Sequence, residues 1–306
     1  MKQTTKALLA VFCGNTIFGF SFLASRIILE KYSVFTLLSA RFILAFAVMN
    51  LLILLKVFTV NFKNKNIFPL ILLGACQPVI YFICESYGIK LTNSSFSGTL
   101  IAMVPIFAFF FAAAMLGEKL SVKALLWGIC SVAGVIIISL GGSANGEVTL
   151  PGILLLVGAV ITGALFNVLS RKASARFSPF ERTYVMFALS AVVFTALSLT
   201  ETKGKTFSAI AAMLGDRASL PALLFLSVCS SVIAFMLLNY ATTYITVRQT
   251  SIFSCLTTVI SIIAGIVFLH EPFGGLRQII GSALIIIGVY MVSIGTAQGT
   301  QDSKKA

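Results

Sequence analysis

Charged residues are scarce in this chain: they make up 10% of its 306 residues, and only 9 residues are acidic. A soluble domain has about 25% charged residues. Hydrophobic residues reach 58%, and a soluble fold could not cover that much apolar surface with so few charges. The composition therefore excludes the pair of soluble domains that the length alone would suggest. It predicts an all-α integral membrane protein.

Residues and motifs for catalysis are almost absent as well. The chain has one histidine, His270, and none of the motifs of zinc proteases, serine hydrolases or phosphate-binding loops. We therefore expect no enzyme, no cofactor, no metal site and no self-contained ATP-driven pump. The six cysteines all lie inside apolar runs, which indicates packing rather than a disulfide framework or a metal site.

Ten apolar segments, each near the length of about 20 residues that a membrane-spanning helix needs, account for most of the chain. They cover residues 7–29, 33–55, 67–88, 95–116, 122–140, 150–169, 180–200, 220–241, 247–269 and 273–295. We expect ten transmembrane helices joined by short loops, with no extramembrane domain.

The basic residues lie mostly between these segments. The excess of 22 Lys and Arg over 9 acidic residues would raise nucleic-acid binding in a soluble protein, but here it indicates topology. With the N-terminus inside, inner segments hold twice as many basic residues as outer loops, so both termini are expected in the cytoplasm and no nucleic-acid partner is expected. The inner group is Lys2, Lys6, Lys56, Lys63, Lys65, Lys119, Lys123, Arg171, Lys172, Arg176, Arg182, Arg248, Lys304 and Lys305. The outer group is Arg26, Lys31, Lys90, Lys203, Lys205, Arg217 and Arg277.

The second half of the chain repeats the first, with halves at residues 1–145 and 146–306. Five segments per half is an odd number, so the second copy enters the membrane from the opposite side. Such inverted repeats are typical of secondary transporters, which bind substrate near the midplane between the halves. A shift of 153 residues matches Glu118 with Glu271, Tyr87 with Tyr240 and Gly128 with Gly281, and a shift of 144 matches Gly19 with Gly163 and Phe22 with Phe166.

Three motifs in the first half resemble tandem EamA domains of the drug/metabolite transporter superfamily. They are Phe18-Gly19-x-x-Phe22, the run from Ser33 to Arg41, and the residues Leu-Gly-Glu-Lys-Leu-Ser at 116–121. The resemblance extends from about residue 8 to residue 294. It implies two inverted five-helix repeats, a central cavity, and export of amino acids or other small metabolites. Three positions depart from the family pattern: Val34 replaces a common proline, Met186 stands near the place of Arg41 in the second repeat, and Phe18 replaces a frequent tryptophan.

Two ionisable residues, Arg41 and Glu85, lie well inside apolar segments. A charge there is unfavourable by roughly 2.5–3.5 kcal/mol on insertion scales, so each side chain needs a partner or water. Helix geometry places them at similar depths. Two interpretations stay open: a gate or zwitterion-binding site, and a structural ion pair between the second and third helices.

A stripe of polar residues predicts a cavity face on the third helix. Gln77, Tyr81 and Glu85 are spaced four apart and share one side of a helix, and three large polar groups are too many to face lipid. The Ser and Thr side chains of the ninth segment indicate hydrogen bonds between helices instead. The candidate substrate-binding residues are Asn15, Phe22, Gln77, Tyr81, Glu85, Phe166, Asn167 and Tyr240, with Arg41 and Glu85 as gate or ion pair.

Together these patterns predict a multi-pass transporter of the cell membrane that moves a small molecule by alternating access. Because Glu85 could exchange a proton, protons are the candidate coupling ion. The alternatives are a passive channel or facilitator, and an uptake or drug-efflux carrier of the same fold. The chain is expected to act as a monomer or homodimer within the lipid bilayer.

The glycines at 128, 134, 274, 281 and 288 are expected to let helices pack closely.

Overall fold

The computed structural model describes residues 3–116, 122–144, 148–245, 247–270 and 275–302. Regular structure in these ranges is entirely helical, as predicted. The matched residues Glu118 and Glu271 lie outside them. In the first half the helices are α1 (Gln3–Leu29), α2 (Val34–Leu54), α3 (Phe68–Gly74), η1 (Ala75–Ile80), α4 (Tyr81–Lys90), α5 (Ser94–Ile101), α6 (Val104–Leu116) and α7 (Val122–Ala144). In the second half they are α8 (Leu150–Ala173), α9 (Pro179–Glu201), α10 (Thr206–Gly215), α11 (Ser219–Leu224), η2 (Phe225–Ile233), α12 (Ala234–Tyr244), α13 (Val247–Leu269) and α14 (Gly275–Asp302).

Seven helical stretches in the described part are long and apolar enough to cross a membrane. They are Gln3–Leu29, Val34–Leu54, Phe68–Lys90, Ser94–Met115, Leu150–Ala173, Pro179–Glu201 and Ser219–Tyr244. Each coincides with a predicted segment. The remaining three predicted segments correspond to α7, α13 and α14, whose described apolar stretches are shorter. The total of ten spans therefore stays a prediction.

Polar residues at the segment boundaries begin several of these helices. The side chains of Ser33, Asn93, Thr149 and Ser178 each accept a hydrogen bond from the backbone amide three residues later. Such N-caps satisfy amides that have no partner inside the helix. The apolar run after each cap can then enter the bundle with its first turn already formed.

Three predicted spans are not continuous α-helices. The third contains the π-helical turn η1, in which Gln77 has non-helical dihedral angles (φ −148°, ψ 122°) and Pro78 has no amide hydrogen to donate. The fourth breaks between α5 and α6, just before Pro105. The eighth contains a second π-helical turn, η2. The segment after residue 201, predicted to be a loop, also contains the helix α10.

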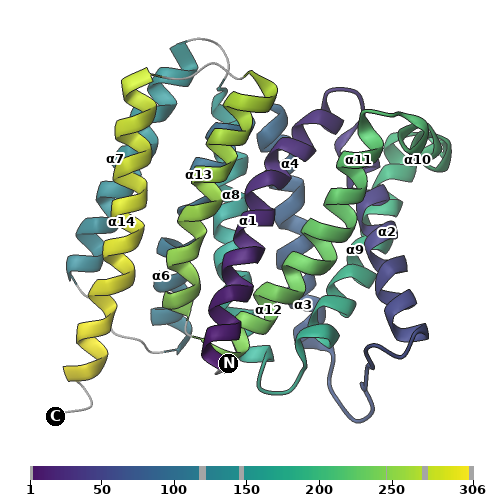
Figure 1. Ribbon diagram of the computed structural model, residues 1–306, viewed down its shortest axis with the longest axis horizontal. Coiled ribbons are helices and arrows are strands. Elements are labelled where there is room, and N and C mark those ends of the chain that lie inside the picture. Colours follow the sequence, from purple (N-terminus) through teal and green to yellow (C-terminus); the bar gives the residue numbers. More distant parts are fainter. Residues whose placement is uncertain (1–2, 117–121, 145–147, 246, 271–274, 303–306) are drawn as a thin grey trace.

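The pair α7 and α14 lies at one edge of the bundle, and α1, α8 and α13 occupy its middle (Figure 1). Glycines make the close α7–α14 contact possible: a Cβ on Gly134 would meet the carbonyl oxygen of Gly281 at 2.6 Å, and the reverse distance is the same. The prediction of close helix packing is confirmed for Gly134, Gly281 and Gly288, whose contacts join α7 and α14 of one chain, and the glycine at 274 lies outside the described residues. Helix α1 begins and α14 ends at the same side of the bundle (Figure 1).

Candidate functional site

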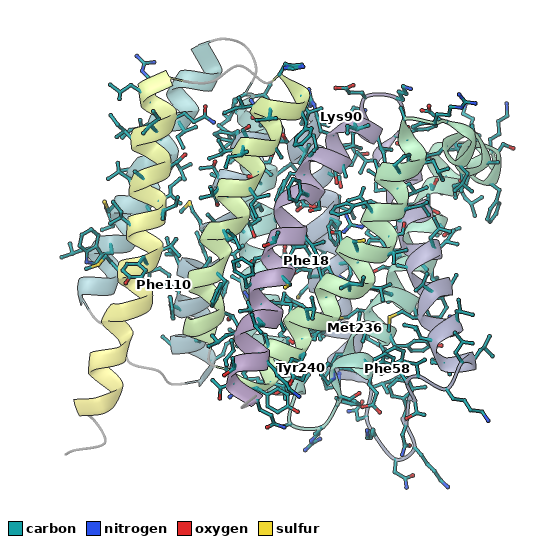
Figure 2. All side chains as sticks on the ribbon, viewed as in Figure 1. Phe18, Phe58, Lys90, Phe110, Met236 and Tyr240 are labelled. Carbon is teal, nitrogen blue, oxygen red and sulfur yellow. The ribbon has the colours of Figure 1, made fainter. Side chains whose placement is uncertain are left out.

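A central cavity of about 100 Å³ opens between helices of both halves. Its walls come from α1, η1, α4, the break between α5 and α6, α8, α12 and α13. Phe18, one of its lining residues, lies between the ends of the bundle marked by Lys90 and Tyr240 (Figure 2). The structure brings together seven of the eight predicted binding residues here: Asn15, Phe22, Gln77, Tyr81, Glu85, Phe166 and Asn167.

Tyr240 is the exception. It lines a second hollow of about 740 Å³, together with Phe58, Phe180 and Met236, at the end of the bundle where α1 begins (Figure 2). The repeat match with Tyr87 predicts where Tyr240 lies along its helix, but it does not predict which way the side chain points around the helix axis. Tyr87 does not line the central cavity either; its ring packs edge-on against Phe35. The placement of Tyr240 at the central cavity is therefore corrected.

Glu85 and Tyr81 form the polar centre of one cavity wall. The Tyr81 hydroxyl donates a 2.9 Å hydrogen bond to Oε1 of Glu85. Both residues lie on α4, one turn apart, and both are nearly inaccessible from the outside of the protein. Among the described residues, Oε2 of Glu85 has no hydrogen-bond donor, so it remains available to a molecule in the cavity.

Two carboxamides from different halves also face the cavity. Gln77 stands where η1 departs from helical geometry, and Asn167 lies on α8. Neither side chain makes a hydrogen bond within the described residues. Asn15, by contrast, is engaged: its Nδ2 donates to the carbonyl of Val11, and its Oδ1 accepts from Thr257. The break at Gln77 thus presents an uncommitted amide that a regular helix pattern would not position.

Arg41 is fully buried but does not line the cavity. Its Nε donates to Ser231 at 2.9 Å and its Nη2 to Ser230 at 3.0 Å, both on η2. Its guanidinium also lies 4.2 Å from the ring centroid of Phe82, a cation–π distance. The predicted ion pair with Glu85 is absent from the contacts of the described residues, although the two charges attract each other at longer range. A direct structural pair is therefore wrong for this conformation, and the π-helical turn takes its place.

Sequence reasoning missed a second fully buried arginine, Arg182. Its Nη1 donates to the carbonyl and hydroxyl of Ser170, and its Nη2 donates at 2.7 Å to the Asn239 carbonyl and the Thr243 hydroxyl. Arg182 lies only a few residues inside its apolar segment, so the charge count assigned it to an inner loop. The signal that could have found it is the polar run of Asn239, Thr242 and Thr243 on α12.

Two further arginines make matching contacts in the two halves. Arg26, near the end of α1, donates to the carbonyls of Ile89 and Lys90 at the end of α4. Arg171, near the end of α8, donates to the carbonyls of Thr242 and Thr243 at the end of α12. Arginine at the carboxyl end of a helix satisfies carbonyls that have no partner inside the helix. A shift of 145 residues relates the two arginines, and 153 relates their acceptors.

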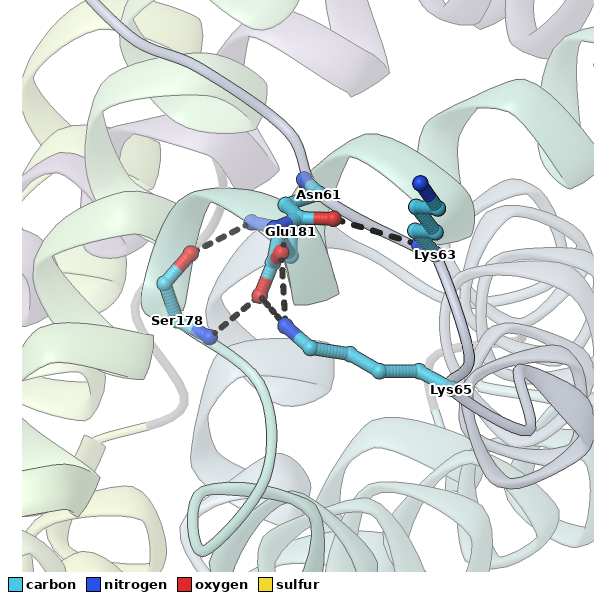
Figure 3. A network of polar contacts seen from close by, with 5 residues as sticks. All are labelled: Asn61, Lys63, Lys65, Ser178 and Glu181. Atoms are coloured by element: carbon cyan, nitrogen blue, oxygen red, sulfur yellow. Dashed lines mark hydrogen bonds and ion pairs between the residues drawn. The ribbon is translucent and has the colours of Figure 1, made fainter.

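A polar network ties the two halves (Figure 3) beside the second hollow, which Ser178 and Tyr240 both line. Glu181, at the start of α9, accepts hydrogen bonds from the side chain of Lys65 and the backbone amides of Asn61 and Ser178. It completes a capping box with Ser178. Its partners Asn61 and Lys65 belong to the connection between α2 and α3, so this connection is held against the second half.

A second ion pair joins the halves through other connections. Lys31, after α1, lies 3.0 Å from Oδ2 of Asp216, between α10 and α11. The Ser219 hydroxyl, then Lys31 and the Ala218 amide, hydrogen-bond Asp216 and hold its pKa below the usual value for aspartate. Lys31 is exposed and Asp216 is partly exposed, so the stabilisation by this pair is subject to screening by salt.

The sequence profile of the EamA-like transporter family matches residues 5–140 and 150–294. The chain belongs to the EamA-like transporter family. The profile occurs twice in tandem and covers most of the chain, which confirms the resemblance found in the motifs. Both matched ranges contribute walls to the central cavity.

Relatives of this EamA-like protein carry transporter names without a stated substrate. The "Uncharacterized transporter YcxC" of Bacillus subtilis (strain 168) is 30% identical over 305 residues, which is 98% of this chain and 96% of that protein. The "Uncharacterized transporter YetK" of the same strain is 26% identical over 97% of this chain and 90% of its own length. A solved crystal structure shares the fold, with a TM-score of 0.65 at 18% identity over 96% of this chain and 98% of that one. The protein is therefore a multi-pass membrane transporter of this family.

Proposed function

We propose that the chain is a secondary transporter that exports amino acids or related small metabolites by alternating access through the central cavity. The observation that carries this proposal is the position of the cavity. It lies inside the bundle between two copies of one sequence profile, and residues matched by the repeat, Phe22 and Phe166, line it from both copies. The described lining residues suit the binding of a small molecule, since one carboxyl group, Glu85, and two carboxamides, Gln77 and Asn167, face the cavity among aromatic rings.

Contacts at the helix ends support an inverted relationship between the halves. Arg26, at the end of α1, donates to the carbonyl of Ile89. Thr149, which caps the start of α8, hydrogen-bonds the carbonyl of Leu91, two residues further along. Helix α1 therefore ends where its counterpart α8 begins, so the two run in opposite directions. Exchanging the conformations of two such halves converts an inward-open state into an outward-open one.

One contact of each matched glycine follows the same relationship. A Cβ on Gly19 would lie 2.6 Å from Ile260 and 3.1 Å from the carbonyl oxygen of Thr257. A Cβ on Gly163 would lie 3.2 Å from the Tyr81 ring and 3.4 Å from a methyl group of Val104. The repeat matches Gly19 with Gly163 and Val104 with Thr257, whereas the nearest neighbours, Ile260 and Tyr81, are not matched.

Transport in proteoliposomes tests the proposal. A substrate is first identified by a thermal-shift screen of the purified protein against a metabolite library. We expect saturable transport with counterflow, and we expect Gln77→Ala, Tyr81→Ala and Asn167→Ala each to reduce it. Tyr240→Ala is the matched control, because Tyr240 lines the other hollow. Undiminished transport in the three cavity variants would place the site elsewhere.

The same vesicles separate the alternatives. A passive channel or facilitator gives flux without counterflow, and an uptake carrier accumulates substrate in the direction opposite to that proposed here. Proton-coupled antiport, with Glu85 as the exchanging group, requires an imposed pH gradient to drive efflux. Indifference to that gradient would remove protons from the mechanism. The oligomeric state, monomer or homodimer, is read from the same preparation by light scattering.

The cell membrane, with both termini in the cytoplasm, is the location that the basic residues support. Single cysteines on a cysteine-free background test this orientation. Lys205→Cys lies in the exposed segment before α10, and Lys63→Cys lies in the exposed segment before α3. An impermeant thiol reagent added to intact cells should label the first and not the second. The reverse pattern would invert the topology.

A further inference from the structure

We propose that the central cavity binds its substrate by an ammonium group at Glu85 and selects amines over metabolites that carry a free carboxylate. This inference rests on the proposed transport function and narrows its substrate from amino acids and related metabolites to those related metabolites that carry an amine and no free carboxylate. Amino-acid amides, amino-acid esters and aromatic amines fit the proposed site better than the parent amino acids do.

The first argument is the charge of the walls. Glu85 is the single carboxyl group among the lining residues in the described part of the chain, and these include no lysine, arginine or histidine. Arg41, which could have received a carboxylate, is directed to Ser230 and Ser231. A substrate carboxylate would therefore lose its hydration without meeting a positive partner, and burying an unpaired charge is strongly unfavourable. An ammonium group would meet the Glu85 carboxylate directly.

The second argument is the balance of donors and acceptors. An ammonium group has three hydrogens to donate and accepts none. Oε2 of Glu85 is uncommitted, and Gln77 and Asn167 each offer an amide oxygen. The hydroxyls of Tyr81, Ser21 and Thr257 already donate their hydrogens, to Glu85, Phe18 and Asn15 respectively. Hence three uncommitted oxygens, Oε2 of Glu85 and the amide oxygens of Gln77 and Asn167, are enough to accept the three hydrogens of an ammonium group.

The third argument is the aromatic surface around the carboxylate. Phe18, Phe22, Tyr81, Phe82 and Phe166 line the cavity with Glu85. Aromatic faces attract cations electrostatically, most strongly where water is excluded. The Phe82 ring already holds the Arg41 guanidinium at 4.2 Å, which shows that these rings can accept a cation. The same rings would contact the apolar part of an amine substrate.

The competing role for Glu85 is that of a structural counter-ion for Arg41. That role requires a contact, and the nitrogens of Arg41 that make hydrogen bonds donate to the two serines instead. The guanidinium of Arg41 therefore leaves the oxygens of Glu85 unoccupied. Oε2 of Glu85 thus stays open to the cavity, as an oxygen that binds a cation must be.

Calorimetric binding to the purified full-length protein tests the selectivity with three probes that share a phenyl group. Phenethylamine is a cation, phenylalanine a zwitterion and 3-phenylpropionate an anion near neutral pH. We expect phenethylamine to bind more tightly than phenylalanine by about tenfold or more, the effect of one charge-assisted interaction, and 3-phenylpropionate not to bind. Glu85→Gln should weaken phenethylamine by about tenfold or more, and Glu85→Asp, which keeps the charge, should recover part of the loss. Tyr240→Phe is the control and should bind all three as the parent does.

Several results would overturn the proposal: no binding of phenethylamine, equal or tighter binding of phenylalanine or 3-phenylpropionate, or unchanged phenethylamine affinity in Glu85→Gln. The unfolding temperatures of the ligand-free variants show whether Glu85→Gln loses affinity because it misfolds. If it does, the phenethylamine affinity of Glu85→Asp, which keeps the charge, tests the proposal instead. Counterflow of the same labelled probes separates this inference from the proposed function. Counterflow of phenylalanine without phenethylamine refutes the selectivity and leaves transport intact. Selective amine binding without counterflow of any bound probe refutes transport and leaves the site.

Discussion

Tyr81 donates its phenolic hydrogen to Glu85 one helical turn further along α4, at 2.9 Å. The bond occupies Oε1 of the carboxylate, whereas Oε2 has no hydrogen-bond donor among the described residues. A carboxylate buried in a membrane protein has few such partners, so the orientation of Glu85 depends strongly on this one hydroxyl.

Removing that hydroxyl should weaken substrate binding without unfolding the protein. We expect Tyr81→Phe to reduce substrate affinity by about threefold to tenfold, the effect of one hydrogen bond, while the ring still fills its place in the wall. Tyr87→Phe is the matched control on the same helix, because the Tyr87 hydroxyl makes no hydrogen bond within the described residues and Tyr87 does not line the cavity. Equal losses in both variants would contradict the role of Tyr81.

The contact between Arg41 and η2 predicts that removing the two serine acceptors destabilises the protein more than removing the arginine. Ser230→Ala with Ser231→Ala leaves a buried guanidinium without its acceptors, so it should destabilise the protein by about 3 kcal/mol or more. Arg41→Met removes the charge together with its need for acceptors and should be milder. Combining all three changes should recover part of the loss of the serine mutant, measured as thermal unfolding in a double-mutant cycle. Additive effects would show that the contact is unimportant.

Arg182 should be irreplaceable by lysine. The lysine ammonium cannot reach both the Ser170 and the Asn239 carbonyls as the planar guanidinium fork does. We expect Arg182→Lys to lower the free energy of unfolding by about 2–4 kcal/mol, through loss of charge-assisted hydrogen bonds. Arg176→Lys, in the exposed turn before α9, is the control and should unfold as the parent does. A tolerated Arg182→Lys would mean that its contacts do not hold α9 to α12.

The close approach of α7 and α14 predicts a strong effect of one methyl group. Gly134→Ala should destabilise the helix pair by about 1–3 kcal/mol, because its Cβ would lie 2.6 Å from a backbone oxygen that cannot rotate away. Gly128→Ala on the same helix is the control, since its nearest neighbour is a side-chain methyl of Ile106 at 3.3 Å. Similar unfolding temperatures for the two variants would contradict the contact.

Acid should weaken the connection between Lys31 and Asp216. Because the pKa of Asp216 is depressed in the folded protein, its stabilisation is present above the usual aspartate pKa of about 3.9 and is lost as the pH falls through the lower folded value. The unfolding temperature of Asp216→Asn should therefore lie below that of the parent near neutral pH and converge with it in acid. The difference should shrink in high salt. If the difference in unfolding temperature between the parent and Asp216→Asn grew in acid, the expected pH dependence would be wrong.

Much of the fold was predictable because local sequence determines it. An apolar run of spanning length specifies where a helix lies whatever it packs against. Polar residues such as Ser33 and Ser178, which cap the first turn, specify where the helix begins. The fourfold spacing of Tyr81 and Glu85 likewise places both on one face, and the cavity confirms it. Pro105 stands just after the break between α5 and α6, so that break had a signal in the sequence that a hydrophobic pattern overlooks.

Rotation about helix axes and long-range acceptors could not be predicted in the same way. Depth along the membrane placed Arg41 near Glu85, but the direction of each side chain depends on how α2 packs against η2, far away in sequence. Arg182 depends on acceptors of α12 that lie more than fifty residues away in the chain, so the polar run there shows that a partner is needed but not which residue it is. The placement of Tyr240 at the second hollow has the same origin, since a repeat match between two residues does not imply that their side chains face the same cavity.

The pairing of α7 with α14 has a consequence for the order in which the protein is made. The two helices lie about half the chain apart, so α7 is synthesised and inserted long before its partner exists. Until α14 is made, Gly134 lacks the backbone of Gly281 that lies against it in the finished protein. The last helix of the chain thus completes a contact for which the last helix of the first half has waited, and truncation before residue 275 would leave α7 without its main partner.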